Sequence, residues 1–296
     1  MKAIKLQGRA FGFVAIGIAL AAKAIPRFDE QSELLVLAVL ILLLGVPHGA
    51  LDTVFAHDLY SVRTARDWLI LTFAYLLPVM MVVGLWRATP LLFLALFLVV
   101  SMVHFSGDPT AGTPLVTRIL FGGAILVLPA LLHAADLVRL FSFLTGSEAA
   151  ARAASCLHAL ALPWLLAVTL ALGAAAYRSL WLTVLEFAAL ALLAIFAPPL
   201  VAFTIFFCGM HSARHILRTF EYAGRSSPRF LLAACLAPML AVLVMSALAM
   251  AWLRQVPVEP RVVQIVFVGL AALTVPHMAL VEPVRFSGWE KRAVAG

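Results

Sequence analysis

The sequence has 296 residues, of which 64% are hydrophobic and only 12% are charged. A soluble domain carries about a quarter charged residues, so this composition excludes an ordinary soluble globular protein. The formal net charge of +7 comes from Lys and Arg that stand singly in short connections. Such charges are typical of membrane topology signals and contacts with anionic lipid, and they argue against nucleic-acid binding.

Apolar runs of about twenty residues recur along the whole chain, and each is long enough to cross a bilayer as a helix. We predict an all-α, polytopic transmembrane bundle that forms a single domain over residues 1–296, with about ten membrane segments (eight to ten). In chain order the segments are residues 10–25, 33–50, 68–86, 90–106, 115–134, 156–177, 180–197, 199–217, 229–253 and 262–281.

Pro198-Pro199 is the only break between the seventh and eighth segments. A double proline favours a tight turn at the membrane surface, and a kinked or re-entrant element is the alternative. The first segment follows Lys2, Lys5 and Arg9 as a signal peptide would, but the many later spans favour an uncleaved helix.

The Lys and Arg residues are distributed unequally between the two sides of a ten-span arrangement. About fourteen of the 21 fall on the side that holds both termini. The positive-inside rule therefore predicts cytoplasmic termini and a multi-pass protein of the inner (plasma) membrane.

Five of the eight histidines fall near the C-terminal ends of segments that run from outside to inside. We expect these to gather at the cytoplasmic edge: His48, His104, His211, His215 and His277. His133 and His158 fall at the opposite edge and are interpreted as surface or packing residues. His57 is interpreted as interfacial.

Four motifs contain the gathered histidines: GVPHGALD (Gly45–Asp52), HFSGD (His104–Asp108), HSARH (His211–His215) and PHMALVEP (Pro276–Pro283). Ionisable groups at membrane depth are costly, so a cluster of them indicates a functional site. His211 and His215 are four residues apart, so on a helix they share one face and can bind the same ion. Together with His48 and His104 they predict a buried metal site.

The supporting residues follow from the same spacing. Asp52 and Asp108 each lie four residues after a histidine, where a carboxylate can orient an imidazole from behind. An ion pair with Arg63 or Arg66 is the alternative for Asp52. His277 is predicted to be a second-shell or substrate-side group.

Imidazole suits zinc, copper, iron and nickel. A zinc site with three imidazoles and a water stays open as an alternative. A fourth neutral imidazole with open coordination positions fits iron(II) that takes dioxygen somewhat better.

The motifs resemble, in combination and in order, those of the Brp/Blh family of membrane-bound β-carotene 15,15′-dioxygenases. The likeness extends from about Gly45 to Pro283. It implies an iron(II) oxidoreductase that uses O2 to cleave β-carotene at its central double bond into two all-trans-retinal molecules. It also implies the iron ligands His48, His104, His211 and His215. A functional link to a retinal-binding rhodopsin would follow from such a product.

A forty-carbon polyene has no aqueous route, so we expect it to enter sideways from the membrane lipid into an apolar slot. Aromatic residues near the ligand candidates are predicted to line that slot: Phe105, Phe203, Phe206 and Phe207.

Two charged residues near the motifs carry no catalytic prediction. Arg214 is interpreted as a topology or headgroup anchor. Glu186 lies mid-span and is expected to hydrogen-bond a neighbouring helix while protonated. The three cysteines show no paired spacing and are interpreted as small core residues.

Other functions remain open at this point. A transporter or proton relay could use the same groups, but the outer halves of the histidine-bearing segments are almost wholly apolar. A non-enzymatic assembly factor for a retinal protein would need no metal. Within the enzyme class, a membrane desaturase or hydroxylase would normally need more histidine boxes than this chain offers.

Overall fold

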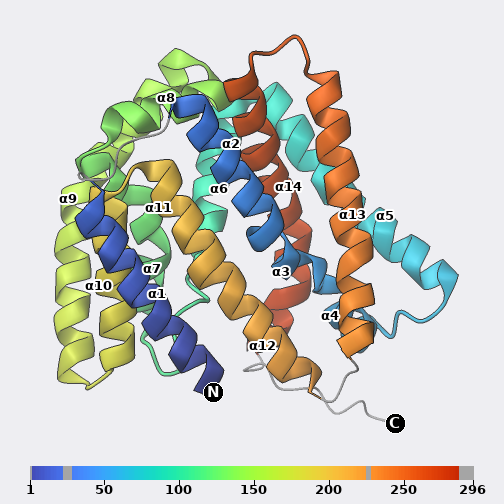
Figure 1. Ribbon diagram of the computed structural model, residues 1–296, viewed down its shortest axis with the longest axis horizontal. Coiled ribbons are helices and arrows are strands. Elements are labelled where there is room, and N and C mark those ends of the chain that lie inside the picture. Colours follow the sequence, from blue (N-terminus) through green and yellow to red (C-terminus); the bar gives the residue numbers. More distant parts are fainter. Residues whose placement is uncertain (1, 23–28, 225–227, 287–296) are drawn as a thin grey trace.

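The computed structural model describes residues 2–22, 29–224 and 228–286, and the regular elements in these ranges are all helical (Figure 1). The α-helices are α1 Lys2–Ala21, α2 Glu30–Leu40, α3 Pro47–Ala50, α4 Asp52–Tyr60, α5 Ala65–Ala88, α6 Pro90–Phe105, α7 Leu115–Val127, α8 Ala134–Thr145, α9 Ser147–Tyr177, α10 Trp181–Phe196, α11 Pro199–Phe206, α12 Ala213–Ala223, α13 Pro228–Trp252 and α14 Val258–Phe286. Three shorter turns of other helix types join them: η1 Ile41–Gly45, η2 Leu128–Leu131 and η3 Phe207–Ser212.

The predicted helical membrane bundle is confirmed. In the described chain, seven helical stretches are long and apolar enough to cross a bilayer, or up to eight if the bent pair α7–η2 and α8 counts as one span. Helices α6 and α10 are apolar but shorter. The ten-span count and the placement of the termini stay predictions.

The predicted turn at Pro198-Pro199 is confirmed. Ala197 and Pro198 are extended, with ψ of 151° and 141°, and α11 begins at Pro199. Proline at the first helical position lacks only an N–H that would have no intrahelical partner there. Figure 1 shows α10 rising to this turn and α11 and α12 descending from it.

The segment predicted over residues 115–134 ends earlier than expected. Helix α7 stops at Val127, η2 contains Pro129, and α8 leaves at 110° to the first part. Proline inside a helix removes a hydrogen bond and clashes with the preceding turn, which explains the break. The amphipathic α8 lies in a stretch where no element was predicted.

Two π-helical turns pack against each other beside the histidine motifs. Turn η1 ends at Gly45, three residues before His48, and η3 contains His211. A Cβ at Gly45 would lie 2.4 Å from Cε1 of Phe207, so only glycine permits this close approach. Such wide turns are frequent at functional sites, because the inserted residue changes which side chains face inward.

Candidate metal centre

Five imidazole rings converge inside the bundle from α3, the end of α6, η3, α12 and α14. The ring centroids of His104 and His211 are 4.5 Å apart, and those of His48 and His211 are 4.9 Å apart. His277 lies 5.1 Å from His48 and 5.0 Å from both His104 and His215. All five side chains are buried. The expectation that histidines far apart in the chain gather at one place therefore agrees with the structure.

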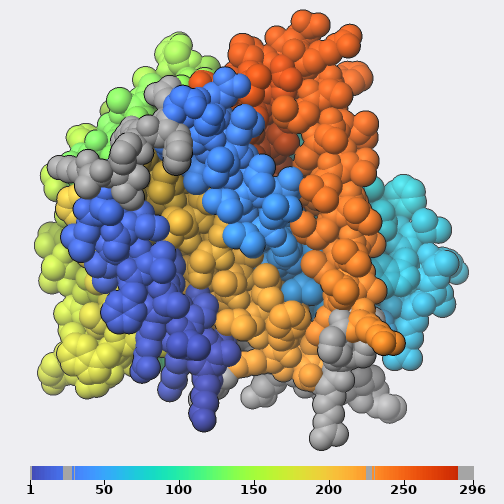
Figure 2. Space-filling view, viewed as in Figure 1, coloured from blue at the N-terminus to red at the C-terminus, as the bar shows by residue number. Residues whose placement is uncertain are grey.

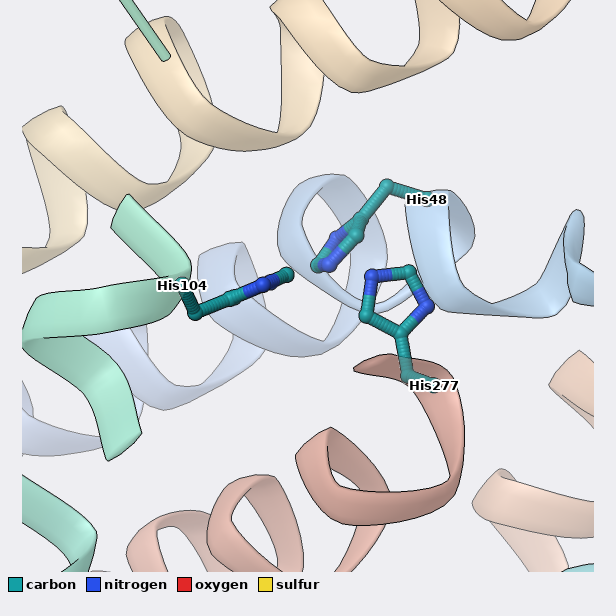
Figure 3. Close-up of side chains that lie close together, drawn as sticks. All are labelled: His48, His104 and His277. Atoms are coloured by element: carbon teal, nitrogen blue, oxygen red, sulfur yellow. The ribbon is translucent and has the colours of Figure 1, made fainter. Parts of the chain in front are cut away.

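Figure 3 shows three of these rings directed toward one another from three different helices. One nitrogen from each of His48, His104 and His277 lies within 4.8 Å of the others, as a shared metal ion requires. Imidazole nitrogens are ligands for zinc, copper, iron and nickel, so this donor set suits a transition metal.

Carboxylates and a backbone carbonyl hold the outer nitrogens of three imidazoles. Nδ1 of His277 donates to Oδ1 of Asp52 at 2.6 Å, and the Tyr75 hydroxyl donates to the other oxygen of Asp52 at 3.0 Å. Nδ1 of His211 lies 3.0 Å from Oδ1 of Asp108. Nδ1 of His48 donates to the carbonyl of Gly45. Such bonds fix the tautomer and turn the opposite nitrogen toward the metal.

The inward-facing nitrogens provide the test of whether a metal fits. Nε2 of His211, Nε2 of His277 and Nδ1 of His104 are buried, with no hydrogen-bond partner in the described part of the chain. A buried polar atom without a partner costs about 1–3 kcal/mol, so several at one point need an explanation. A cation held by His48, His104 and His277, whose nitrogens lie within 4.8 Å of one another, would supply a partner at this point, and the residues present fit a metal.

The four histidines predicted as ligands all lie in this cluster. His277, predicted to be a second-shell or substrate-side group, has a nitrogen within 4.8 Å of nitrogens of His48 and His104, and its Nδ1 bonds to Asp52. Asp52 and Asp108 each contact an imidazole, but not that of the histidine four residues earlier in the sequence. Asp52 bonds to His277 and Tyr75 rather than to an arginine, and Asp108 lies 3.0 Å from His211. The signal for His277 was present in its helix-end position, but spacing could not tell a ligand from a neighbour.

The remaining histidines lie elsewhere. Nδ1 of His133 lies 3.2 Å from Asp136, and Nδ1 of His158 donates to the carbonyl of Ala130 at 2.7 Å. His133 precedes α8 and His158 lies in α9, two helices that Figure 1 shows side by side. His57 is 38% exposed and lies beside Asp58, as an interfacial residue would.

The interpretation of Arg214 as a headgroup anchor is wrong. Arg214 is fully buried, and its Nη2 lies 2.6 Å from Oε1 of Glu186 on α10. It also donates to the Gln7 side chain on α1 and to the backbone carbonyl of Asp108. Glu186 therefore forms an ion pair rather than the expected hydrogen bond of a protonated acid. The sequence carries no short-range signal that joins residues on three separate helices.

This ion pair holds the loop that carries Asp108. Nη1 of Arg218 donates to the carbonyl of Gly107 at 2.8 Å, next to the bond from Arg214 to the carbonyl of Asp108. On α1, a Cβ at Gly8 would lie 1.9 Å from Oε1 of Glu186, so glycine lets α1 close over the pair. The arrangement fixes Asp108 and through it the orientation of His211.

The four predicted aromatic residues form the apolar side of the cluster. The Phe207 ring stacks on His211 at 5.6 Å and meets His48 edge-on at 5.5 Å. Phe105 lies 4.9 Å from His211. Phe203 stacks on Phe207 at 5.4 Å, and Phe206 is fully buried. Phe207 and Phe105 thus contact the imidazoles, the Phe206 ring lies 6.5 Å from that of His211, and Phe203 packs on Phe207.

A family model described as Beta-carotene 15,15'-dioxygenase matches residues 39–284, a range that contains all five clustered histidines. The chain belongs to this family. The β-carotene 15,15′-dioxygenase family is a family of oxidoreductases, so the chain is an enzyme and the resemblance seen in the motifs is confirmed.

A relative from an uncultured marine bacterium, 66A03, named Beta-carotene 15,15'-dioxygenase, is 30% identical over 255 residues. The match covers 82% of this chain and 90% of that protein. No solved structure matches the chain.

Proposed function

We propose that the protein uses iron(II) and dioxygen to cleave β-carotene at its central double bond into two molecules of all-trans-retinal. Both atoms of O2 enter the products: the carbon–carbon double bond breaks and each carbon takes one oxygen, which gives two aldehydes. The family membership and the apolar surroundings of the imidazole cluster support this substrate class.

The observation that carries the proposal is the buried cluster of imidazoles, in which one nitrogen from each of His48, His104 and His277 lies within 4.8 Å of the others. We propose His48, His104, His211, His215 and His277 as the residues that hold the metal. Iron(II) would supply the dioxygen activation and redox chemistry that amino-acid side chains lack. Because all the proposed ligands are neutral nitrogen donors, they would leave the positive charge of the iron uncompensated.

The protein's own residues would prepare the site. Asp52 and Asp108 keep the proton on the outer nitrogen of His277 and His211, so that the inner nitrogen stays available. Phe207 and Phe105 pack on the imidazoles and exclude water from the reacting double bond. Their ring faces would also stabilise positive charge that develops on the polyene.

We further propose that the chain is one domain with about ten membrane crossings (eight to ten), cytoplasmic termini and the metal site toward the cytoplasmic side of the inner membrane. The excess of Lys and Arg on one side supports this orientation. Retinal released into the same bilayer would be available to a retinal-binding rhodopsin.

Expression in cells that make β-carotene tests the reaction. We expect loss of the orange colour and appearance of retinal by chromatography, and no reaction with His211→Ala. His158→Ala, which removes a histidine 2.7 Å from a carbonyl at the other end of the bundle, is the matched control and should stay active.

Retained colour with a metal-loaded protein would overturn the assignment of substrate. Metal analysis of the purified protein separates iron from zinc, and a preparation that is active with zinc alone would overturn the assignment of iron.

A further inference from the structure

An apolar groove of about 700 Å³ opens beside the imidazole cluster, where α12 and α13 meet the α3–α4 corner. This volume lies within the range of about 300–1,000 Å³ that is typical of small-molecule sites. The groove is lined in part by Pro47, Ile216, Phe220, Leu231, Leu232 and Cys235. Among the described residues, no charged side chain lines it.

The groove is lined by residues of α3 and α12, the helices that carry His48 and His215. Pro47 directly precedes His48 on α3, and Ile216 directly follows His215 on α12. His48 is the most exposed of the five imidazoles at 7%, although all are buried. A molecule in the groove would therefore lie against the two helices that carry these ligand candidates.

Helix α13 forms the outer wall and is only lightly embedded in the bundle. None of the described residues 231–252 is buried. It contacts the α3–α4 corner through the bond from the Thr53 hydroxyl to the carbonyl of Ala234 at 3.1 Å and a weak contact of Cys235 with the carbonyl of Pro47. Figure 2 shows α13 (orange) exposed along its length at the side of the molecule. Few buried contacts mean that this wall can move at little cost.

A second apolar groove differs from the first in its position relative to the clustered histidines. It has a volume of about 320 Å³ and lies between α8 and α9, where His158 lines it. None of its described lining residues adjoins a clustered histidine in sequence. Apolar character alone therefore does not select the α12–α13 groove, but its position against the helices that carry His48 and His215 does.

We propose that the α12–α13 groove is the entry and binding site for the long, uncharged polyene substrate, which passes sideways from the lipid to the imidazole cluster. The proposal rests on the proposed function. A polyene hydrocarbon has neither charge nor hydrogen-bonding groups, so it loses nothing on entering a groove without polar partners. A peptide or a nucleotide would leave its polar groups unsatisfied in the same place.

Leu232→Trp tests this, because Leu232 lines the groove and its 60% exposure leaves room for a larger side chain without overpacking the core. Leu231→Trp, a half-buried position in the same groove, is a second test. Leu166→Trp on α9 is the matched control, since Leu166 is 63% exposed on another helix. Initial rates against β-carotene concentration give KM and kcat, and metal content and thermal stability in detergent show that each variant is folded.

We expect the groove variants to raise KM or lower kcat/KM by roughly tenfold, the ratio that corresponds to a steric cost of about 1.4 kcal/mol, with metal content unchanged. Leu166→Trp should match the parent protein. If Leu232→Trp keeps the parent KM and kcat while the parent turns over β-carotene, the groove proposal is overturned and the proposed function stands. If the metal-loaded parent does not cleave β-carotene, the proposed function itself fails.

Discussion

The two flanks of the imidazole cluster are built in opposite ways. On one flank, α1, α10 and α12 surround a fully buried Arg214–Glu186 pair whose hydrogen bonds reach the Asp108 loop. On the other flank, an uncharged groove separates α12 from α13, a helix whose described residues 231–252 include none that is buried. One part of the bundle thus holds the metal ligands rigidly, and another part gives access to them. Metal ligands need neighbouring side chains that fix their orientation. A substrate that comes from the lipid needs a helix that can move aside to admit it.

The largest effect is expected at the cluster itself, which both flanks share. His277→Ala should lower metal affinity by more than about 100-fold, because ligands matter more than the outer groups whose loss costs about 10–100-fold. Metal content of the purified protein after dialysis measures this. His133→Ala, which also loses a histidine bound to an aspartate, is the control. If His277→Ala keeps its metal, the fifth imidazole is not a ligand.

The rigid flank is tested by Glu186→Ala. Removing one partner of a buried ion pair leaves an uncompensated charge, so we expect a loss of about 3–5 kcal/mol in the free energy of unfolding. Denaturant titration in detergent measures it. Glu148→Ala removes a carboxylate that is 85% exposed and pairs with Arg152 on the surface of α9. That change should cost less than about 1 kcal/mol. Equal losses in the two variants would contradict the contrast between the flanks.

Asp108→Asn tests whether the rigid flank supports metal binding through the orientation of His211. The amide keeps the size of the side chain but removes the negative charge that favours one tautomer, so metal affinity or activity should fall by about 10–100-fold. The matched control is Asp136→Asn, which changes the partner of His133. Metal-binding isotherms of Asp108→Asn and of the parent protein measure the change in affinity. The free energy of unfolding of the variant should stay close to that of the parent. An unchanged isotherm would mean that Asp108 does not orient the ligand.

The smallest effect is expected for Tyr75→Phe, which removes only the 3.0 Å bond from the hydroxyl to Asp52. A single hydrogen bond contributes a net of about 0.5–1.5 kcal/mol, so metal affinity should drop by about two- to tenfold. Tyr177→Phe, at a position 92% exposed, is the control. A loss as large as that of His277→Ala would show that Tyr75 does more than hold Asp52.

The class of protein, most of the apolar helices and the gathering of the histidines followed from the sequence alone, whereas the break after Val127 and helix α8 did not. Apolar length is a local property, because each membrane segment must satisfy its own backbone hydrogen bonds. Because successive predicted spans alternate in direction, histidines at the ends of predicted segments two, four, eight and ten are expected at one edge without any knowledge of packing. His48, His104, His211 and His215 were found in this way.

Which side chains contact the imidazole cluster depends on the tertiary structure and could not be read from the sequence. Hydropathy does not set the rotation of a helix about its axis, and the π turns η1 and η3 shift that rotation just where the histidines lie. The contacts of His277 with His48 and His104, and those of Arg214 with Glu186 and Gln7, likewise depend on how separate helices pack. The groove beside α13 likewise depends on which helices are neighbours, a long-range property that no local pattern records.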